Sequence, residues 1–154
     1  MMATNPTILL AEDNEDTRGV YSLILRHFGF EVAEAVTGQE AIEIARDKQP
    51  ALVLMDIGLP VLDGWQASRV LKSEPSTAGI PLIAFSARVD STADLGGRAT
   101  FDGFILKPIS PLELVRRVQA YLGLLSPIKR AVPDISPAID RYDDVGAAPT
   151  EMAI

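Results

Sequence analysis

The chain has 154 residues, with 14 basic and 21 acidic side chains, no Cys and a formal net charge of −7. This length predicts one domain with a full hydrophobic core, and the lack of Cys excludes disulfides and cysteine-ligated metals. The negative charge disfavours nucleic-acid phosphates and anionic membrane surfaces, and no segment resembles a signal peptide or membrane span, so we expect a cytoplasmic protein without nucleic-acid or membrane partners.

Apolar runs of strand length alternate with amphipathic stretches of helix length along the chain. Strands are predicted at residues 7–11, 31–35, 52–55, 82–85 and 103–106, and helices at 17–28, 39–48, 65–72 and 112–122. Most of these strands are almost continuously apolar, which is typical of a parallel sheet covered on both faces. The repeated strand–helix units predict an α/β fold, a doubly wound five-stranded parallel sheet with helices on both faces.

Each predicted helix carries an apolar stripe that is expected to pack on the sheet. The stripe of the first helix comprises Val20, Leu23, Ile24 and Phe28. The stripe of the last helix comprises Leu112, Val115, Val118 and Leu122.

Two regions lack a regular pattern. The segment 88–100 has helix length but contains Gly96 and Gly97, which cost about 1 kcal/mol each relative to Ala, so a short or irregular fourth helix is predicted there. Residues 126–154 contain four Pro and little periodicity. We therefore expect a folded domain at 1–125 and an extended or disordered C-terminal tail at 126–154.

Polar side chains stand where four of the predicted strands end. They are Glu12 and Asp13, Asp56, Ser86 and Lys107. The carboxyl ends of parallel strands share one edge of the sheet, so these groups are expected to converge. Clustered carboxylates repel one another unless a hard divalent cation binds them, which predicts a Mg²⁺ or Mn²⁺ site. A Lys ammonium and a Ser hydroxyl beside it would serve phosphoryl transfer, with Asp56 as the nucleophile.

Each of these residues also has a purely structural interpretation. Glu12, Asp13 and Asn14 precede a helix and can cap it, and Asp56 can be a turn acid before Gly58. Ser86 and Lys107 are unremarkable as single residues. Their joint occurrence at successive strand ends favours the functional interpretation. For His27 and Trp65, in contrast, we expect helix-end and packing roles.

Four stretches carry a resemblance to a known family. ILLAEDNEDTR, VLMDIGLPVLDGWQASRVLK, PLIAFSA and FDGFILKPISPLELV resemble the receiver domain of two-component response regulators, the CheY-like family, over residues 7 to about 123. The resemblance implies the strand order 2-1-3-4-5. It also implies that Asp56 accepts a phosphoryl group from a sensor histidine kinase or a histidine phosphotransfer protein.

The same resemblance assigns roles to the other residues of the site. Glu12, Asp13 and Asp56, with the backbone carbonyl of Gly58, would hold Mg²⁺. Ser86 would bond a phosphoryl oxygen, and Lys107 would pair with the phosphoaspartate. The family further implies a cis peptide bond between Lys107 and Pro108.

As the family implies, the protein would be a switch rather than an enzyme. It would assist its own phosphoryl transfer and dephosphorylation, and movements of Ser86 and Phe104 would be read by a downstream protein on the face of the fourth helix, fifth strand and fifth helix. Phe104 stands where many members carry Tyr, Thr100 stands where Gly is common, and Ser86 and Lys107 are one position closer together than usual. These departures concern the output face more than the site.

Other functional classes fit the sequence less well. A haloacid-dehalogenase-type phosphatase would need a DxDx[TV] loop, but Asp56 is followed by Ile57 and Gly58. Flavin or nucleotide binding would need a glycine-rich loop after the first strand, where acids stand instead. The strongest alternative is a receiver-like adaptor that binds partners without being phosphorylated.

Overall fold

Five parallel strands form a single sheet in a computed structural model, which describes residues 5–87 and 100–124. The strands are β1 (Thr7–Ala11), β2 (Glu31–Ala35), β3 (Leu52–Met55), β4 (Leu82–Ser86) and β5 (Gly103–Leu106). Their order is β2-β1-β3-β4-β5, and every neighbouring pair is parallel. The predicted topology is confirmed. Because β2 lies on one side of β1 and β3 lies on the other, the carboxyl ends of β1 and β3 are next to each other.

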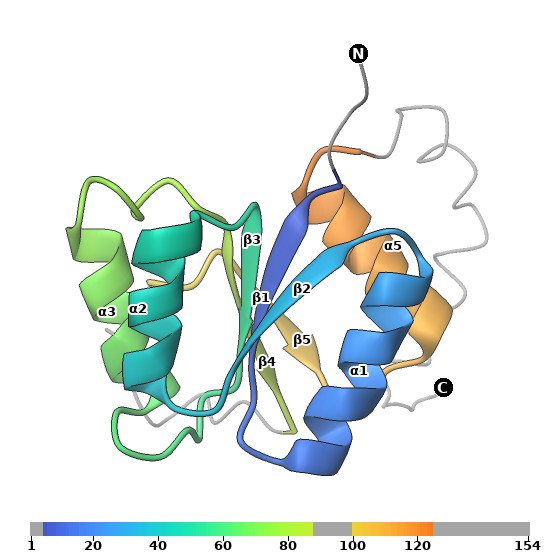
Figure 1. The fold of residues 1–154 in the computed structure, drawn as a ribbon, viewed down its shortest axis with the longest axis horizontal. Coiled ribbons are helices and arrows are strands. Elements are labelled where there is room, and N and C mark those ends of the chain that lie inside the picture. The colour runs from blue at the N-terminus through green and yellow to red at the C-terminus, as the bar shows by residue number, and fades with distance from the viewer. Residues whose placement is uncertain (1–4, 88–99, 125–154) are drawn as a thin grey trace, which may run out of the picture. The chain divides into compact units, whose positions relative to one another are not determined.

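Four described helices cover the two faces of this sheet. They are α1 (Glu15–His27), α2 (Gly38–Lys48), α3 (Gly64–Ser73) and α5 (Pro111–Tyr121). As Figure 1 shows, α2 and α3 lie on one face, and α1 and α5 lie on the other. The predicted helices agree with these bounds to within two residues. The segment expected to form an irregular fourth helix falls mostly outside the described residues.

Side-chain oxygens fix where each helix begins. The side chains of Asn14, Thr37, Asp63 and Ser110 each accept a hydrogen bond from a backbone N–H in the first turn of the helix that follows. Such caps stabilise a helix by about 1 kcal/mol because they satisfy donors that have no partner within the helix. Because Asn14 caps α1, the capping interpretation applies to Asn14 and leaves Glu12 and Asp13 for another role.

The sheet separates two hydrophobic cores. One joins β-strand residues such as Leu9 and Val53 to Ile42 of α2 and Leu71 of α3. The other joins Leu54 and Phe85 to Leu25 of α1 and to residues of α5. Side chains that alternate along β1 and β3 enter opposite cores, which explains why these strands are apolar at every position.

The expected apolar stripe of α1 is confirmed at Ile24, which packs against the second core, but it was wrong at the other three positions. Val20, Leu23 and Phe28 are 54%, 70% and 44% exposed, and the helix buries Tyr21 and Leu25 instead. The sequence carries apolar residues on two adjoining sides of this helix, so periodicity did not decide between them. In α5 the expected Val115 and Val118 are buried and Leu122 packs against the core. Only Leu112 of that stripe is exposed, and Leu114 is buried instead.

Contacts divide the chain into one unit at residues 1–122 and a second at 123–154. Almost all of the second unit lies outside the described residues, so the expected tail at 126–154 stays a prediction. None of the helices in the described ranges has the length and hydropathy that a bilayer crossing requires.

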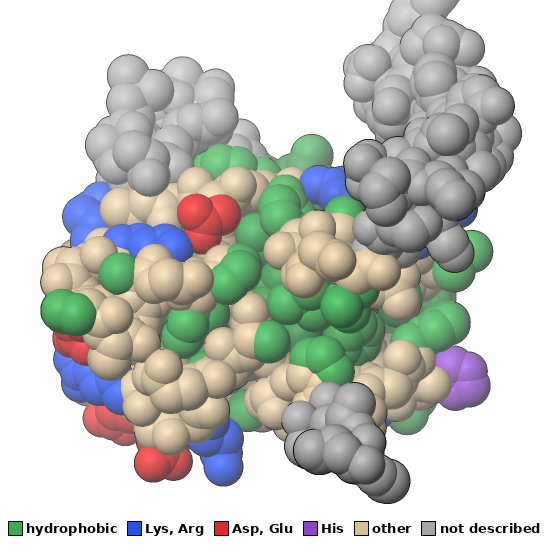
Figure 2. All heavy atoms as spheres, turned by 90° about the horizontal axis from the view of Figure 1, so that it is seen from above, with side chains coloured by type: hydrophobic (Ala, Val, Ile, Leu, Met, Phe, Trp, Pro, Cys, Tyr) green, Lys and Arg blue, Asp and Glu red, His purple; other side chains and the backbone are tan. Residues whose placement is uncertain are grey.

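Figure 2 looks onto the end of the molecule where β1 begins. Charged side chains gather there mainly on the side of α2 and α3, and hydrophobic ones lie nearer the middle. The acidic residues that follow β1 and β3 lie at the opposite end of the strands.

Candidate functional site

Three carboxylates meet at the carboxyl end of the sheet. Glu12 and Asp13 follow β1 directly, and Asp56 follows β3. The two strands are neighbours in register, with Ala11 beside Met55, and the Asp56 N–H donates to the carbonyl of Ala11 at 2.9 Å. Parallel pairing therefore brings together acids that are more than forty positions apart in the sequence.

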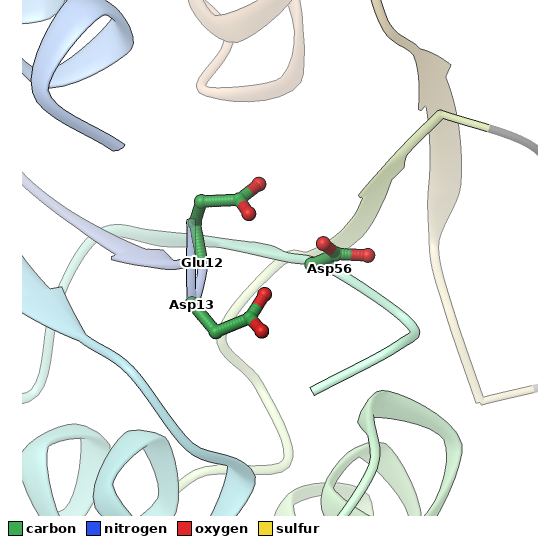
Figure 3. Close-up of side chains that lie close together, drawn as sticks. All are labelled: Glu12, Asp13 and Asp56. Carbon is green, nitrogen blue, oxygen red and sulfur yellow. The ribbon is translucent and has the colours of Figure 1, made fainter. Parts of the chain in front are cut away.

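The three acids turn toward one space. Figure 3 shows Glu12 and Asp13 leaving the end of β1 with their carboxylates on the side that faces Asp56. One oxygen of each carboxylate lies within 4.8 Å of the others. Glu12 is buried, Asp56 is half-buried and Asp13 is exposed. The site thus has a closed inner side and an open outer side.

Lys107 supplies the positive charge of the site. Its ammonium forms an ion pair with Oε1 of Glu12 and lies 3.5 Å from Oδ2 of Asp56. The other Glu12 oxygen, Oε2, accepts from the backbone N–H of Asn14 at 3.0 Å. Both oxygens of the buried carboxylate are therefore engaged, which offsets the cost of burying its charge.

The donor set fits a hard divalent cation. Three carboxylates and one ammonium carry a formal charge of −2 in a partly buried place, and a small oxygen-seeking cation such as Mg²⁺ relieves that repulsion. Glu12, Asp13 and Asp56 are the residues that would hold it. Asp13, as the exposed member, gives such a cation access from solvent.

The remaining predicted residues lie at the same edge of the sheet. The N–H of Gly58 donates to Oδ1 of Asp56 at 3.1 Å, which ties the Asp56 carboxylate to its own loop. Ser86 is the buried last residue of β4, and its carbonyl accepts from the N–H of Lys107 at 2.8 Å. Ser86 thus ends β4, and Lys107 directly follows the neighbouring strand β5. The peptide bond between Lys107 and Pro108 is cis, as expected.

Phe104 stands apart from the carboxylates, in an aromatic cluster. Its ring lies 5.7 Å from Phe101 and 6.4 Å from Trp65, and Trp65 meets Phe101 edge to face at 5.3 Å. Trp65 is almost fully buried, so its expected packing role is confirmed. The cluster joins the first turn of α3 to β5.

A groove adjoins the site on the side of α1. It has a volume of about 440 Å³ and runs between α1 and the loop after β5, where Lys107 forms part of its wall. Val20 and Tyr21 line it from the helix, and Pro108 lines it from the loop. Val20, which was expected in the core, therefore borders the site.

One contact of the site has no counterpart among the residues predicted from the sequence. Nη1 of Arg18 donates to the backbone carbonyl of Glu12 at 3.0 Å, and Nε donates to Oε1 of Glu34 at 3.0 Å. Arg18 is the last residue of the stretch ILLAEDNEDTR, but no role was predicted for it, because the contact depends on how the first turns of α1 pass over the end of β1.

Comparison with known proteins agrees with this geometry. The profile of the response regulator receiver domain matches residues 8–119. The chain is 36% identical over 117 residues to the DNA-binding response regulator MtrA of Mycobacterium tuberculosis, and 36% identical over 116 residues to the transcriptional regulatory protein SrrA of Staphylococcus aureus. These matches cover 75% of this chain but 50% and 47% of the relatives, so the chain spans about half the length of the curated relatives it matches.

Solved structures share the fold. The receiver domain of the sensor histidine kinase PA1611 from Pseudomonas aeruginosa, which has a magnesium ion coordinated in its active site cleft, superposes with a TM-score of 0.69 at 31% identity. That comparison covers 78% of this chain and 99% of the other. The chemotaxis response regulator CheY4 of Vibrio cholerae superposes with a TM-score of 0.71 over 77% of this chain and 99% of its own, and at 23% identity it supports the fold alone.

Proposed function

The chain belongs to the response regulator receiver domain family, which acts in phosphorylation-dependent two-component signalling, and from that premise we propose that Asp56 is the phosphoryl acceptor. The observation that carries this proposal is the convergence of Glu12, Asp13 and Asp56 with Lys107 at one edge of the sheet. Asp56 is the acid of this cluster that follows the central strand β3, and it is reachable because it is only half-buried.

In the transfer step, an oxygen of the Asp56 carboxylate forms a bond to phosphorus as the bond from phosphorus to the donor imidazole breaks. Both the nucleophile and the incoming group are negatively charged, so the main task of the site is to neutralise charge and to align the two groups. Lys107 provides a cation 3.5 Å from Asp56. A bound Mg²⁺, held by Glu12, Asp13, Asp56 and the Gly58 carbonyl, would supply further charge neutralisation.

The same residues would assist the loss of the phosphoryl group to water. In this proposal the protein is a phosphoacceptor regulator whose own residues help to form and to hydrolyse the phosphoaspartate. Ser86 would donate a hydrogen bond to a phosphoryl oxygen. Movement of Ser86 would be coupled to Phe104, whose ring packs beside Trp65 and Phe101.

The open side of the site indicates where the phosphodonor would bind. The phosphodonor, a sensor histidine kinase or a histidine phosphotransfer protein, must reach Asp56, and the groove between α1 and Lys107 offers apolar contact surface beside it. A downstream protein would read the face of the fourth helix, β5 and α5. The absence of nucleic-acid binding by this chain stays a prediction that follows from its net charge of −7. Action in the cytoplasm stays a prediction as well.

Incubation with acetyl phosphate and Mg²⁺ tests the acceptor directly. We expect intact-protein mass spectrometry to show one added phosphoryl group on the wild type and on Asp47→Asn, which removes an exposed carboxylate from α2. We expect none on Asp56→Asn. Equal labelling of wild type and Asp56→Asn, or no labelling of either, would favour the adaptor alternative, in which partners bind without phosphorylation.

A further inference from the structure

We propose that Arg18 is a positioning residue for the cation site, because its guanidinium holds the peptide that joins Glu12 to Asp13. The inference rests on the proposed function, since it concerns the same cation. It adds a residue of α1 that does not itself touch the cation, the acceptor or the phosphoryl group.

Arg18 links the backbone of Glu12, which follows β1, to the side chain of Glu34 on β2, and we call this pair of contacts the clamp. Its side chain is 17% exposed, and its planar fork donates to the carbonyl of Glu12 with Nη1 and to the carboxylate of Glu34 with Nε, both at 3.0 Å. Glu34 lies on β2, and the Glu12 N–H donates to the carbonyl of Ala35 on that same strand at 2.9 Å. Residue 12 is therefore held at its N–H by β2 and at its carbonyl by α1.

The clamp matters because the two acids are held in different ways. The carboxylate of Glu12 is fixed by Lys107 and by the N–H of Asn14. The Asp13 side chain is exposed, and its direction depends on the orientation of the peptide plane between residues 12 and 13. Arg18 holds the carbonyl of that plane. If the plane rotates, the Asp13 carboxylate swings away from Asp56 and the three oxygens no longer surround one point.

Glu34 keeps Arg18 in place. Oε2 of Glu34 accepts from the hydroxyl of Ser22 at 2.8 Å and lies 3.5 Å from Nη2 of Arg26, while Oε1 accepts from Arg18. A carboxylate bonded on both oxygens has little freedom to rotate, so it fixes the direction of the Arg18 fork. Ligand supports of this kind in other metal sites change metal affinity by about 10-fold to 100-fold when they are removed.

Charge and positioning predict opposite effects for the loss of Arg18. Arg18 carries a positive charge close to the acidic cluster, so its removal would by Coulomb's law tighten the binding of a cation. Loss of positioning would weaken it. The sign of the change in Mg²⁺ affinity therefore separates a positioning role from a mere charge.

Arg26 provides a matched control. It lies on the same helix and contacts the same Glu34, and Nη2 also donates to the carbonyl of Val32 at 3.0 Å. None of its contacts in the described residues reaches Glu12. Arg26→Met thus removes an equal charge and a comparable tie between α1 and β2 without touching the peptide after residue 12.

The test is a titration of the full chain with Mg²⁺ alone, followed by the backbone amide NMR signals of Asp13 and Asp56. We expect the dissociation constant of Arg18→Met to rise by about 10-fold, and that of Arg26→Met to stay within about twofold of wild type. Arg18→Lys keeps the charge but lacks the two-pronged fork, so it is expected to bind more weakly than wild type as well.

An Arg18→Met protein that binds Mg²⁺ as tightly as wild type, or more tightly, would overturn the inference. If Arg18→Met does not fold, Arg18→Lys decides by the same criterion. An affinity loss in Arg26→Met as large as that in Arg18→Met would overturn it too, because the effect would then be one of general destabilisation. If the wild type itself binds no Mg²⁺, the proposed function fails, which is a distinct result.

Discussion

Lys107 and Glu12 form a nearly buried ion pair although they stand 95 positions apart in the chain. The lysine follows β5 and the glutamate follows β1, and the same ammonium lies 3.5 Å from Oδ2 of Asp56. The pair therefore links the inner wall of the acidic cluster to the proposed acceptor. Together with the N–H of Asn14, this ion pair offsets the cost of burying the Glu12 carboxylate.

Replacing Lys107 by Met tests whether this ammonium acts in phosphoryl transfer. We expect the rate of labelling of Asp56 by acetyl phosphate at saturating Mg²⁺ to fall by about 10²-fold to 10³-fold, the usual cost of losing one aligned electrostatic group. Lys48→Met, at an exposed position of α2, serves as the control and should label at the wild-type rate. A Lys107→Met protein that is labelled as fast as wild type would show that the ion pair is structural only.

Val61, in the loop between Asp56 and α3, offers a prediction about stability. It has φ +70°, although it is β-branched, and its side chain is 83% exposed. That backbone conformation costs about 1 kcal/mol or more for such a residue. The exposed side chain buries little apolar surface that could offset this cost. Asn tolerates the left-handed region, so Val61→Asn is expected to raise the free energy of unfolding by about 1 kcal/mol in a urea titration.

Val36→Asn is the control for Val61. Val36 is also exposed, at 37%, and it has no positive φ. We expect no gain in stability from this change. Equal stabilisation by both substitutions would mean that the loss of an exposed apolar side chain, and not relief of backbone strain, is responsible.

Glu34 predicts how stability depends on pH. Partial burial alone would raise the pKa of Glu34, but hydrogen bonds from Ser22 and Arg18 and the charges of Arg26 and Arg18 outweigh it and hold the pKa below the ordinary value of 4.5. A carboxyl whose pKa is lowered by folding stabilises the fold above its unfolded pKa, and this contribution is lost as the pH falls from about 4.5 through the folded pKa.

Glu34→Gln removes that contribution. We expect the variant to be less stable than wild type at pH 7, and the difference to shrink as unfolding is measured at successively lower pH below about 4.5. Glu31→Gln, at an exposed position of the same strand, is the reference. A stability difference between wild type and Glu34→Gln that stays constant down to pH 3 would contradict the prediction.

Gly64 shows how closely α3 approaches the backbone of Asp56. A Cβ at this position would lie 2.4 Å from the carbonyl oxygen of Asp56 and 2.7 Å from Cα of Ile57, and both of these are backbone atoms. Gly64→Ala is therefore expected to lower the free energy of unfolding by about 1–3 kcal/mol, or more, and to slow labelling of Asp56 because its backbone must move.

Gly19→Ala is the matched change at an open position. A Cβ there meets nothing within 4 Å, and Gly19 is an exposed residue inside α1. Ala favours a helix by about 1 kcal/mol over Gly, so a gain in stability is expected, with unchanged labelling. If both substitutions had the same sign in thermal or urea unfolding, the crowding at Gly64 would not be the cause.

The sequence was sufficient to predict the strands and most of the site, for a definite physical reason. Each central strand is apolar until its last residue, so the polar residue that follows marks the edge of the sheet. In a parallel sheet all these edges coincide, so Asp56 and Lys107 were predicted to meet although they are far apart in the chain. The same reasoning could not predict which face of α1 is buried, because Val20 and Tyr21 are both apolar neighbours on the helix.

Sequence alone therefore determined the fold class, the order of the elements and the identity of the acids, since these depend on local periodicity and on the shared direction of the strands. Only the tertiary structure decided that Asn14 and not Glu12 caps α1, that Lys107 pairs with Glu12, and that Arg18 holds the carbonyl after β1. These relationships depend on distances of a few ångströms between elements. Such distances are set by how helices pack on the sheet, and no pattern along one segment of chain contains them.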